Sequence, residues 1–170
     1  MKIVKKISLI DSFMQENIFN LIDYMSKCDE DKLSREVFNQ CLNSLYVVVE
    51  KYTRIDKIEH HSTDIIGIIG CRRIDNLESK ALDPLYYPQK NKLIYSIEFL
   101  QHFCHSYDDC YETISMLVNE CMADKNDAFA EYAYANRDNI DFGVLEKVGF
   151  VKTEAKNPTD TLYLRAPVTY

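Results

Sequence analysis

The sequence predicts a single α/β domain, and three observations lead to this fold class. Predicted strands and helices alternate along the whole chain in the order β-α-α-β-β-β-α-β-α-β-β. A chain of 170 residues has the size of one domain with a substantial core. Its composition, 46% hydrophobic and 28% charged, is ordinary for a globular protein, and no repeat or linker divides it. We therefore expect one domain over residues 1–170.

The chain is expected to begin with a strand and two helices. Weak alternation predicts the strand over Lys2 to Ser8. Asp11 or Ser12 then caps a helix whose apolar residues, as far as Met25, recur at helical spacing. A second helix is predicted from about Lys32 to Leu42.

Two strands follow. Leu45 to Glu50 is β-branched and aromatic, and Asp64 to Ile74 is a nearly continuous apolar run, so both favour strands. We interpret Thr53 to Thr63 as a turn or an irregular extension. Gly67 and Gly70 inside the second strand indicate a bulge or a close backbone approach.

A loop and a long strand come next. Residues 75–91 contain two prolines and have no firm periodicity, so we interpret them either as a lid over a cleft or as a loop that covers the core. Lys92 to Phe103 is predicted as a strand with Tyr95, Ile97 and Phe99 on one face. A helix is expected from Tyr111 to Met122.

The most informative stretch is the helix that follows the next strand, Asp127 to Tyr134. Its apolar stripe runs from Ile140 to Val148, and Gly149 is placed to end it in a left-handed turn. The run Leu145 to Phe150, LEKVGF, follows an Asn-rich turn and resembles the late helix of the GNAT superfamily of acyl-CoA-dependent N-acetyltransferases. That family reads Tyr-Glu-Lys-x-Gly-Phe, and its tyrosine, often the general acid, is Leu145 here.

The resemblance covers nearly the whole chain and implies a GNAT-like mixed, splayed β-sheet flanked by helices on both faces. Lys92–Phe103 would then be parallel to Asp127–Tyr134 and diverge from it at the C-terminal end, with the cofactor in the gap. The helix between them supplies the crossover that a parallel pair needs. Phe150 to Thr153 and Thr161 to Arg165 would complete the sheet.

The expected cofactor is acetyl-CoA, but its phosphate-binding loop is unusual. The family uses Arg/Gln-x-x-Gly-x-Gly/Ala, because glycines let amides approach the pyrophosphate at a helix N-terminus. Here Cys104 to Thr113 fills that place without glycine or arginine. Asp108, Asp109 and Glu112 suit a helix N-terminus but would repel a pyrophosphate. We therefore predict that this acidic segment opposes cofactor binding.

The resemblance also assigns site residues. Glu98 is the candidate general base, and Tyr132 and Tyr134 are candidates for the missing acid. The alternatives are a Glu98 on the solvent face and strand tyrosines in the core or at its rim. Amides of the splayed strand would hold pantetheine and polarise the thioester carbonyl. The expected cofactor-binding residues are Phe99, Leu100, Phe103, Tyr107, Cys110, Tyr111, Thr113, Asn136 and Asn139.

Other chemistry is less favoured. Tyr107 and Tyr111 are interpreted as packing residues rather than a stacking platform. His102, Cys104, His105 and Cys110 do not have a standard zinc spacing, so we expect no metal. A thiolate at Cys104 activated by His102 or His105 is the alternative, and it needs a base within hydrogen-bond reach.

Charge and cysteine usage limit the partners and the location. A net charge of −7 argues against nucleic acid and suits either a cationic substrate or a solvated acidic surface. No apolar run reaches membrane-span length, and the N-terminal stretch is unlike a signal peptide. Six irregularly spaced cysteines indicate reduced thiols in a cytoplasm. A homodimer is left open.

Two functions follow. The first is an acyl-CoA-dependent N-acyltransferase that transfers an acyl group, expected to be acetyl, to an amine-bearing small molecule or protein. The alternative is a catalytically degenerate GNAT-fold binding or regulatory protein that has lost the pyrophosphate loop. Fold alone does not decide between them.

Overall fold

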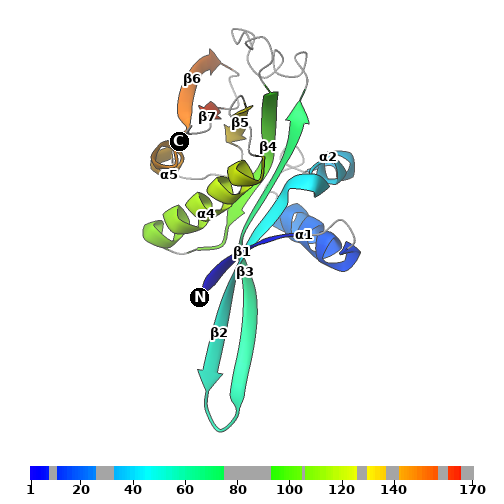
Figure 1. Cartoon of the computed structure of the whole chain (residues 1–170), viewed down its shortest axis with the longest axis vertical. Helices are drawn as coiled ribbons and strands as arrows, with labels where there is room; N and C mark the ends of the chain where they lie inside the picture. The colour runs from blue at the N-terminus through cyan, green and yellow to red at the C-terminus, as the bar shows by residue number, and fades with distance from the viewer. Residues whose placement is uncertain are drawn as a thin grey trace.

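The computed structural model describes residues 1–7, 11–25, 33–74, 93–104, 106–125, 130–136, 142–156 and 161–165. Its elements follow the predicted order (Figure 1). The strands are β1 (Lys2–Lys6), β2 (Leu45–Ile55), β3 (Glu59–Ile74), β4 (Leu93–His102), β5 (Ala130–Asn136), β6 (Val151–Lys156) and β7 (Thr161–Arg165). The helices are α1 (Ser12–Met25), α2 (Arg35–Gln40), the short 3₁₀ turn η2 (Leu42–Ser44), α4 (Tyr107–Lys125) and α5 (Phe142–Lys147).

The strands form one seven-stranded mixed sheet in the order β1-β2-β3-β4-β5-β7-β6. β4 and β5 are parallel, and the other neighbouring pairs are antiparallel. The parallel pairing runs from Leu93 opposite Ala130 to Ile97 opposite Tyr134, whereas β4 itself continues to His102. The predicted parallel pair that separates towards its C-terminal end is therefore confirmed.

Helices cover both faces of this sheet, as predicted, and each face has its own core. α4 and α5 pack over one face, where residues such as Ile69, Leu117 and Leu145 are buried together. α1 and α2 pack over the other face, around Ile18 and Phe38. The mixed α/β architecture predicted from the sequence is therefore confirmed.

β4 contains a bulge at Glu98. Gly70 of β3 lies opposite Phe99, but the next β3 residue, Cys71, lies opposite Ile97, so Glu98 is the extra residue. A bulge reverses the alternation of side chains along a strand. Ile97 consequently belongs to the α4/α5 core and Phe99 to the α1/α2 core, and the predicted common face for these two residues is wrong.

β2 and β3 continue as a two-stranded ribbon that projects from the body of the molecule (Figure 1). Thr53 pairs with His61 and Ile55 with Glu59, so the interpretation of residues 53–63 as irregular is wrong except at the turn. The pairing of β1 ends at Glu50 of β2, and that of β4 ends at Gly67 of β3. The ribbon therefore extends beyond both neighbouring strands.

Helix ends show two further differences. α2 begins only at Arg35, because Ser34 caps it by accepting a hydrogen bond of 3.2 Å from the amide of Val37. α4 begins at Tyr107, so the predicted start at Tyr111 is wrong and the carboxylates lie within the helix rather than in a loop. None of the described helices has both the length and the apolar character of a membrane span. Residues 75–91, interpreted either as a lid or as a loop that covers the core, lie outside the described residues.

Candidate functional site

The candidate site is the region where β4 separates from β5 and leads into α4. Glu98 lies directly after Ile97, the last β4 residue paired with β5. Its Oε1 accepts a hydrogen bond of 2.8 Å from Nε of Arg72 on β3, and both side chains are 20% exposed. The alternative that placed Glu98 on the solvent face is therefore wrong. The bulge holds a largely buried, ion-paired carboxylate at the point of strand separation.

Cys41 adds to the electrostatics around this ion pair. Burial, and then the nearby Glu98 carboxylate, raise the pKa of the Cys41 thiol well above its usual range. A thiol in this environment stays protonated and acts as a small apolar side chain. The Arg72–Glu98 pair therefore lies near a thiol that contributes no charge.

The connection from β4 to α4 is tied to β3. The amide of Phe103 donates to the carbonyl oxygen of Ile66 at 2.9 Å, and Sγ of Cys104 lies 3.3 Å from Oγ1 of Thr113. His102 accepts a hydrogen bond of 3.4 Å at Nδ1 from the backbone amide of Cys104, not from its thiol. This contact positions the backbone and does not make the activated thiolate that the sequence left open with His102.

A serine caps the N-terminus of α4. Oγ of Ser106 accepts a hydrogen bond of 3.2 Å from the amide of Asp109, and its carbonyl oxygen accepts one of 3.0 Å from the amide of Cys110. An anion bound at a helix end would use such amides itself. Ser106 therefore accepts hydrogen bonds from two amides of this helix end, where the family has a glycine loop.

Lys2 of β1 partly neutralises the acidic segment. Its Nζ lies 2.8 Å from Oε2 of Glu112 and 3.1 Å from Oδ1 of Asp109. Partial burial acts to lower the pKa of Lys2, but the hydrogen bonds to Glu112 and Asp109 outweigh it and raise that pKa above its ordinary value. The hydrogen bonds from Lys2 and Ser106 lower the pKa of Asp109. All three carboxylates are exposed, and the ion pairs of Lys2 are with Asp109 and Glu112 rather than with Asp108.

Tyr107 and Tyr111 form a different surface at the same helix end. They are 41% and 36% exposed, and Nζ of Lys147 lies 4.8 Å and 5.5 Å from their ring centroids. These distances are typical of cation–π contacts. The two tyrosines are therefore only partly buried, and their interpretation as packing residues rather than a stacking platform stays a prediction. They present ring surface to solvent beside an ammonium group.

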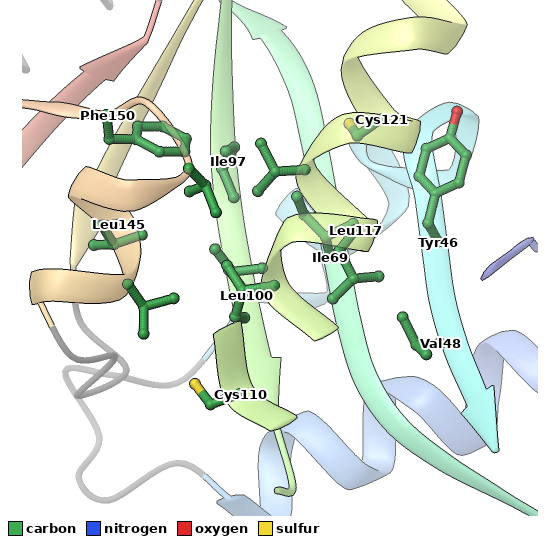
Figure 2. Packing of buried hydrophobic residues seen from close by; sticks show 14 of the residues in the cluster. Tyr46, Val48, Ile69, Ile97, Leu100, Cys110, Leu117, Cys121, Leu145 and Phe150 are labelled. Carbon is green, nitrogen blue, oxygen red and sulfur yellow. The ribbon is translucent and has the colours of Figure 1, made fainter. Parts of the chain in front are cut away.

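Two predicted cofactor-binding residues, Leu100 and Cys110, lie in the α4/α5 core instead of on a surface. Figure 2 shows Leu100, Cys110, Leu145 and Phe150 in one cluster between β4, α4 and α5, and all four are at most 5% exposed. Leu145, which replaces the family tyrosine, is fully buried. This position therefore contributes packing and no polar group.

Solved structures share the fold of this chain. No family model and no curated protein matches the chain. The NatC complex bound to Gag peptide and CoA is similar over 98% of this chain and 99% of that chain, with 13% identity and a TM-score of 0.62. The chain has the GNAT fold.

Two further structures show the same likeness. NAA60 of Arabidopsis thaliana in complex with acetyl-CoA is similar over 96% of this chain and 97% of that chain, with 13% identity and a TM-score of 0.59. A GNAT-family acetyltransferase of Streptococcus agalactiae is similar over 99% and 96%, with 10% identity and a TM-score of 0.61. At such identities the likeness establishes the GNAT fold, and function has to be argued from the site.

Within the GNAT fold, the other predicted residues are distributed as follows. Tyr132, Tyr134 and Asn136 lie on β5, and Asn139 lies outside the described residues, as does His105. Phe103 is half-buried beside the α1/α2 core, which includes Phe99. Thr113 is fully buried against β3. Among the described side chains, no group of three His, Cys, Asp or Glu residues could hold a metal ion.

The surface around the N-terminus of α4 brings together side chains of the kinds that bind phosphates and aromatic rings, without the family's glycine loop. Lys2 forms ion pairs with Asp109 and Glu112, two of the carboxylates that were predicted to repel the pyrophosphate. Lys147 supplies an ammonium group, and Tyr107 and Tyr111 supply aromatic faces. Phosphates bind ammonium groups, and adenine rings stack on aromatic faces. Sequence reasoning missed both lysines, because each acts on residues far from it along the chain.

Proposed function

We propose that the chain is an acyl-CoA-dependent N-acyltransferase that transfers an acetyl group to an amine-bearing substrate. One observation carries the proposal: β4 and β5 separate after Ile97 and Tyr134, and the bulged carboxylate Glu98 stands at that point. The likeness to acetyltransferases solved with CoA or acetyl-CoA supports it. The same proposal includes a cytoplasmic location and, as an assembly to be measured, a homodimer.

Acetyl-CoA, when bound, supplies a thioester that is activated for acyl transfer. The described pairing of β4 with β5 ends at Ile97, and we infer that pantetheine lies beside β4 beyond that residue. We assign Phe99, Leu100 and Phe103 to this region. Lys147, Tyr107 and Tyr111 are assigned to the nucleotide end.

Glu98 is assigned the role of general base. An aliphatic amine is an ammonium ion at neutral pH. It must lose a proton before its nitrogen can attack a carbonyl carbon. Glu98 accepts that proton, directly or through one water molecule. Arg72, 2.8 Å from its Oε1, holds the carboxylate in orientation and is a positioning residue. Tyr132 and Tyr134 remain the candidates for the acid, since Leu145 has no proton to donate.

The decisive experiment combines calorimetric titration with acetyl-CoA and a turnover assay that follows radiolabelled acetyl transfer to a panel of amines. We expect micromolar binding, and we expect Glu98→Gln to lower kcat by about 100-fold while leaving acetyl-CoA affinity unchanged. Glu120→Gln, the same chemical change at an exposed position of α4, is the matched control. Absence of binding at about 1 mM acetyl-CoA would refute the transferase.

A second function, a GNAT-fold binding or regulatory protein without catalysis, is favoured by two specific observations. Leu145 is buried where the family has its tyrosine, and Ser106 caps the helix end that the family leaves to the pyrophosphate. For such a protein, the expected result is either no acetyl-CoA binding at about 1 mM, or binding without acetyl transfer to any tested amine. The same two measurements therefore separate the two functions.

A further inference from the structure

Two buried cysteines from different elements face each other in the α4/α5 core. Sγ of Cys71 on β3 lies 3.2 Å from Sγ of Cys121 on α4, and both residues are 1% exposed. The two positions are 50 residues apart in sequence. Nothing in the proposed acyl transfer uses either thiol.

We propose that Cys71 and Cys121 form an oxidisable dithiol, a modification site whose reversible disulfide fastens α4 to β3. The two sulfurs of a disulfide are about 2.05 Å apart, so these sulfurs need to approach by about 1 Å. The backbone on both sides is well fixed. β3 pairs with β4 at Cys71 and with β2 as far as Gly70, and α4 packs on β3 at Thr113, next to Gly67.

Other described cysteines have different surroundings. Cys41 lies in the opposite core, and burial raises the pKa of its thiol. Sγ of Cys104 contacts Oγ1 of Thr113 instead of another sulfur. Cys110 shares the α4/α5 core but lies near the start of the helix, about three turns from Cys121. The described geometry therefore selects one pair.

The proposed reaction is thiol–disulfide exchange with a low-molecular-weight disulfide such as oxidised glutathione. One cysteine loses its proton, and its thiolate attacks a glutathione sulfur, which forms a mixed disulfide and releases one glutathione thiolate. The second cysteine thiolate then attacks the protein sulfur of the mixed disulfide and releases the other glutathione. The two protons end on the two glutathiones. Since both thiols are buried, exchange requires α4 to open transiently.

The cross-link has a measurable structural consequence. Closing a loop of this length removes unfolded-state entropy, which corresponds to a rise in Tm of roughly 10 °C for a chain of this size. Cys71 also directly precedes Arg72, the partner of Glu98. The disulfide therefore fixes the strand segment that orients the carboxylate.

The test treats the full chain with oxidised glutathione, alkylates the remaining thiols and maps the disulfides by mass spectrometry without reduction. Cleavage at glutamates separates Cys121 from Cys110, because Glu112 and Glu120 lie between them. We expect a Cys71–Cys121 cross-linked peptide, a rise in Tm of roughly 10 °C and reversal of both by dithiothreitol. The number of free thiols should fall by two from the six of the reduced chain.

Variants make the assignment specific. Cys71→Ala and Cys121→Ala should each abolish the oxidation-dependent rise in Tm, whereas Cys110→Ala, in the same helix and core, should retain it. A different cross-link in the wild-type chain, or no cross-link after prolonged exposure, overturns the proposal, and neither result requires a variant to fold. A rise in Tm that persists in Cys71→Ala overturns it as well.

Discussion

Gly67→Ala tests the packing of α4 against β3 of the sheet. A Cβ atom at Gly67 would lie 2.5 Å from Cγ2 of Thr113 and 3.1 Å from Cδ1 of Leu117. Carbon atoms in contact are normally about 3.5–4.0 Å apart, so α4 and β3 would have to separate by roughly 1 Å at Thr113. The end of the Leu117 side chain can move, but the methyl group of a fully buried threonine has little room.

The magnitude follows from two opposing terms. Overpacking a core by one methyl group costs about 1–3 kcal/mol. Replacing glycine in a strand lowers the entropy of the unfolded chain, which raises the free energy of unfolding by about 0.4–1 kcal/mol. The net loss in free energy of unfolding is therefore about 1–2 kcal/mol, and Tm should fall by roughly 2–8 °C.

The assay is urea and thermal denaturation of four chains in a double-mutant cycle with Thr113→Ser. Serine removes Cγ2 but keeps the hydroxyl that lies 3.3 Å from Sγ of Cys104. Gly67→Ala should therefore cost about 1 kcal/mol less in the Thr113→Ser background. Gly70→Ala, whose Cβ would overlap the Phe99 ring on the other face, is the control that Thr113→Ser should not rescue. A neutral Gly67→Ala, or equal costs in both backgrounds, would refute this packing.

Three further predictions concern a backbone conformation, a titration and a charge. Gly149 has φ of 98°, so Gly149→Ala should lower the free energy of unfolding by about 1–2 kcal/mol, measured in urea. Burial lowers the pKa of His102, so the unfolded chain binds the proton more readily. Stability should therefore fall as pH drops below 6.5, by at most about 1.4 kcal/mol per pH unit, and His102→Gln should remove that contribution. Asp108→Asn should tighten CoA binding roughly threefold to tenfold by calorimetry, and Asp109→Asn should do less because Lys2 already pairs with Asp109.

Local patterns were sufficient to predict most of the fold. The helix between β4 and β5 and the glycine stop at Gly149 follow from periodicity and cap chemistry, so the parallel pair was predictable. The Glu98 bulge was not, because nothing in the run around it distinguishes an extra residue from ordinary alternation. The ribbon was missed because residues 53–63 are polar and contain no core-facing alternation.

The site was less predictable than the fold, because its electrostatics depend on residues distant in sequence. Lys2 pairs with Asp109 across a separation of 107 residues. Lys147 reaches Tyr107 from another helix in the same way. The acidic segment could be found in the sequence, but the lysines that compensate or complement it required the three-dimensional arrangement.

The projecting ribbon bears on how the protein behaves in concentrated solution. Strand edges that extend beyond their neighbours can add a strand from another molecule, which is the first step of aggregation. Ile55 and Ile58 near the end of the ribbon are 80% and 69% exposed, so they offer apolar surface to another molecule. Exposed charges at Lys51 and Asp64 lie at its base, where an added strand would have to accommodate them. Solubility of this protein should therefore respond to salt and to charge-removing changes in the ribbon more than to equal changes on the helices.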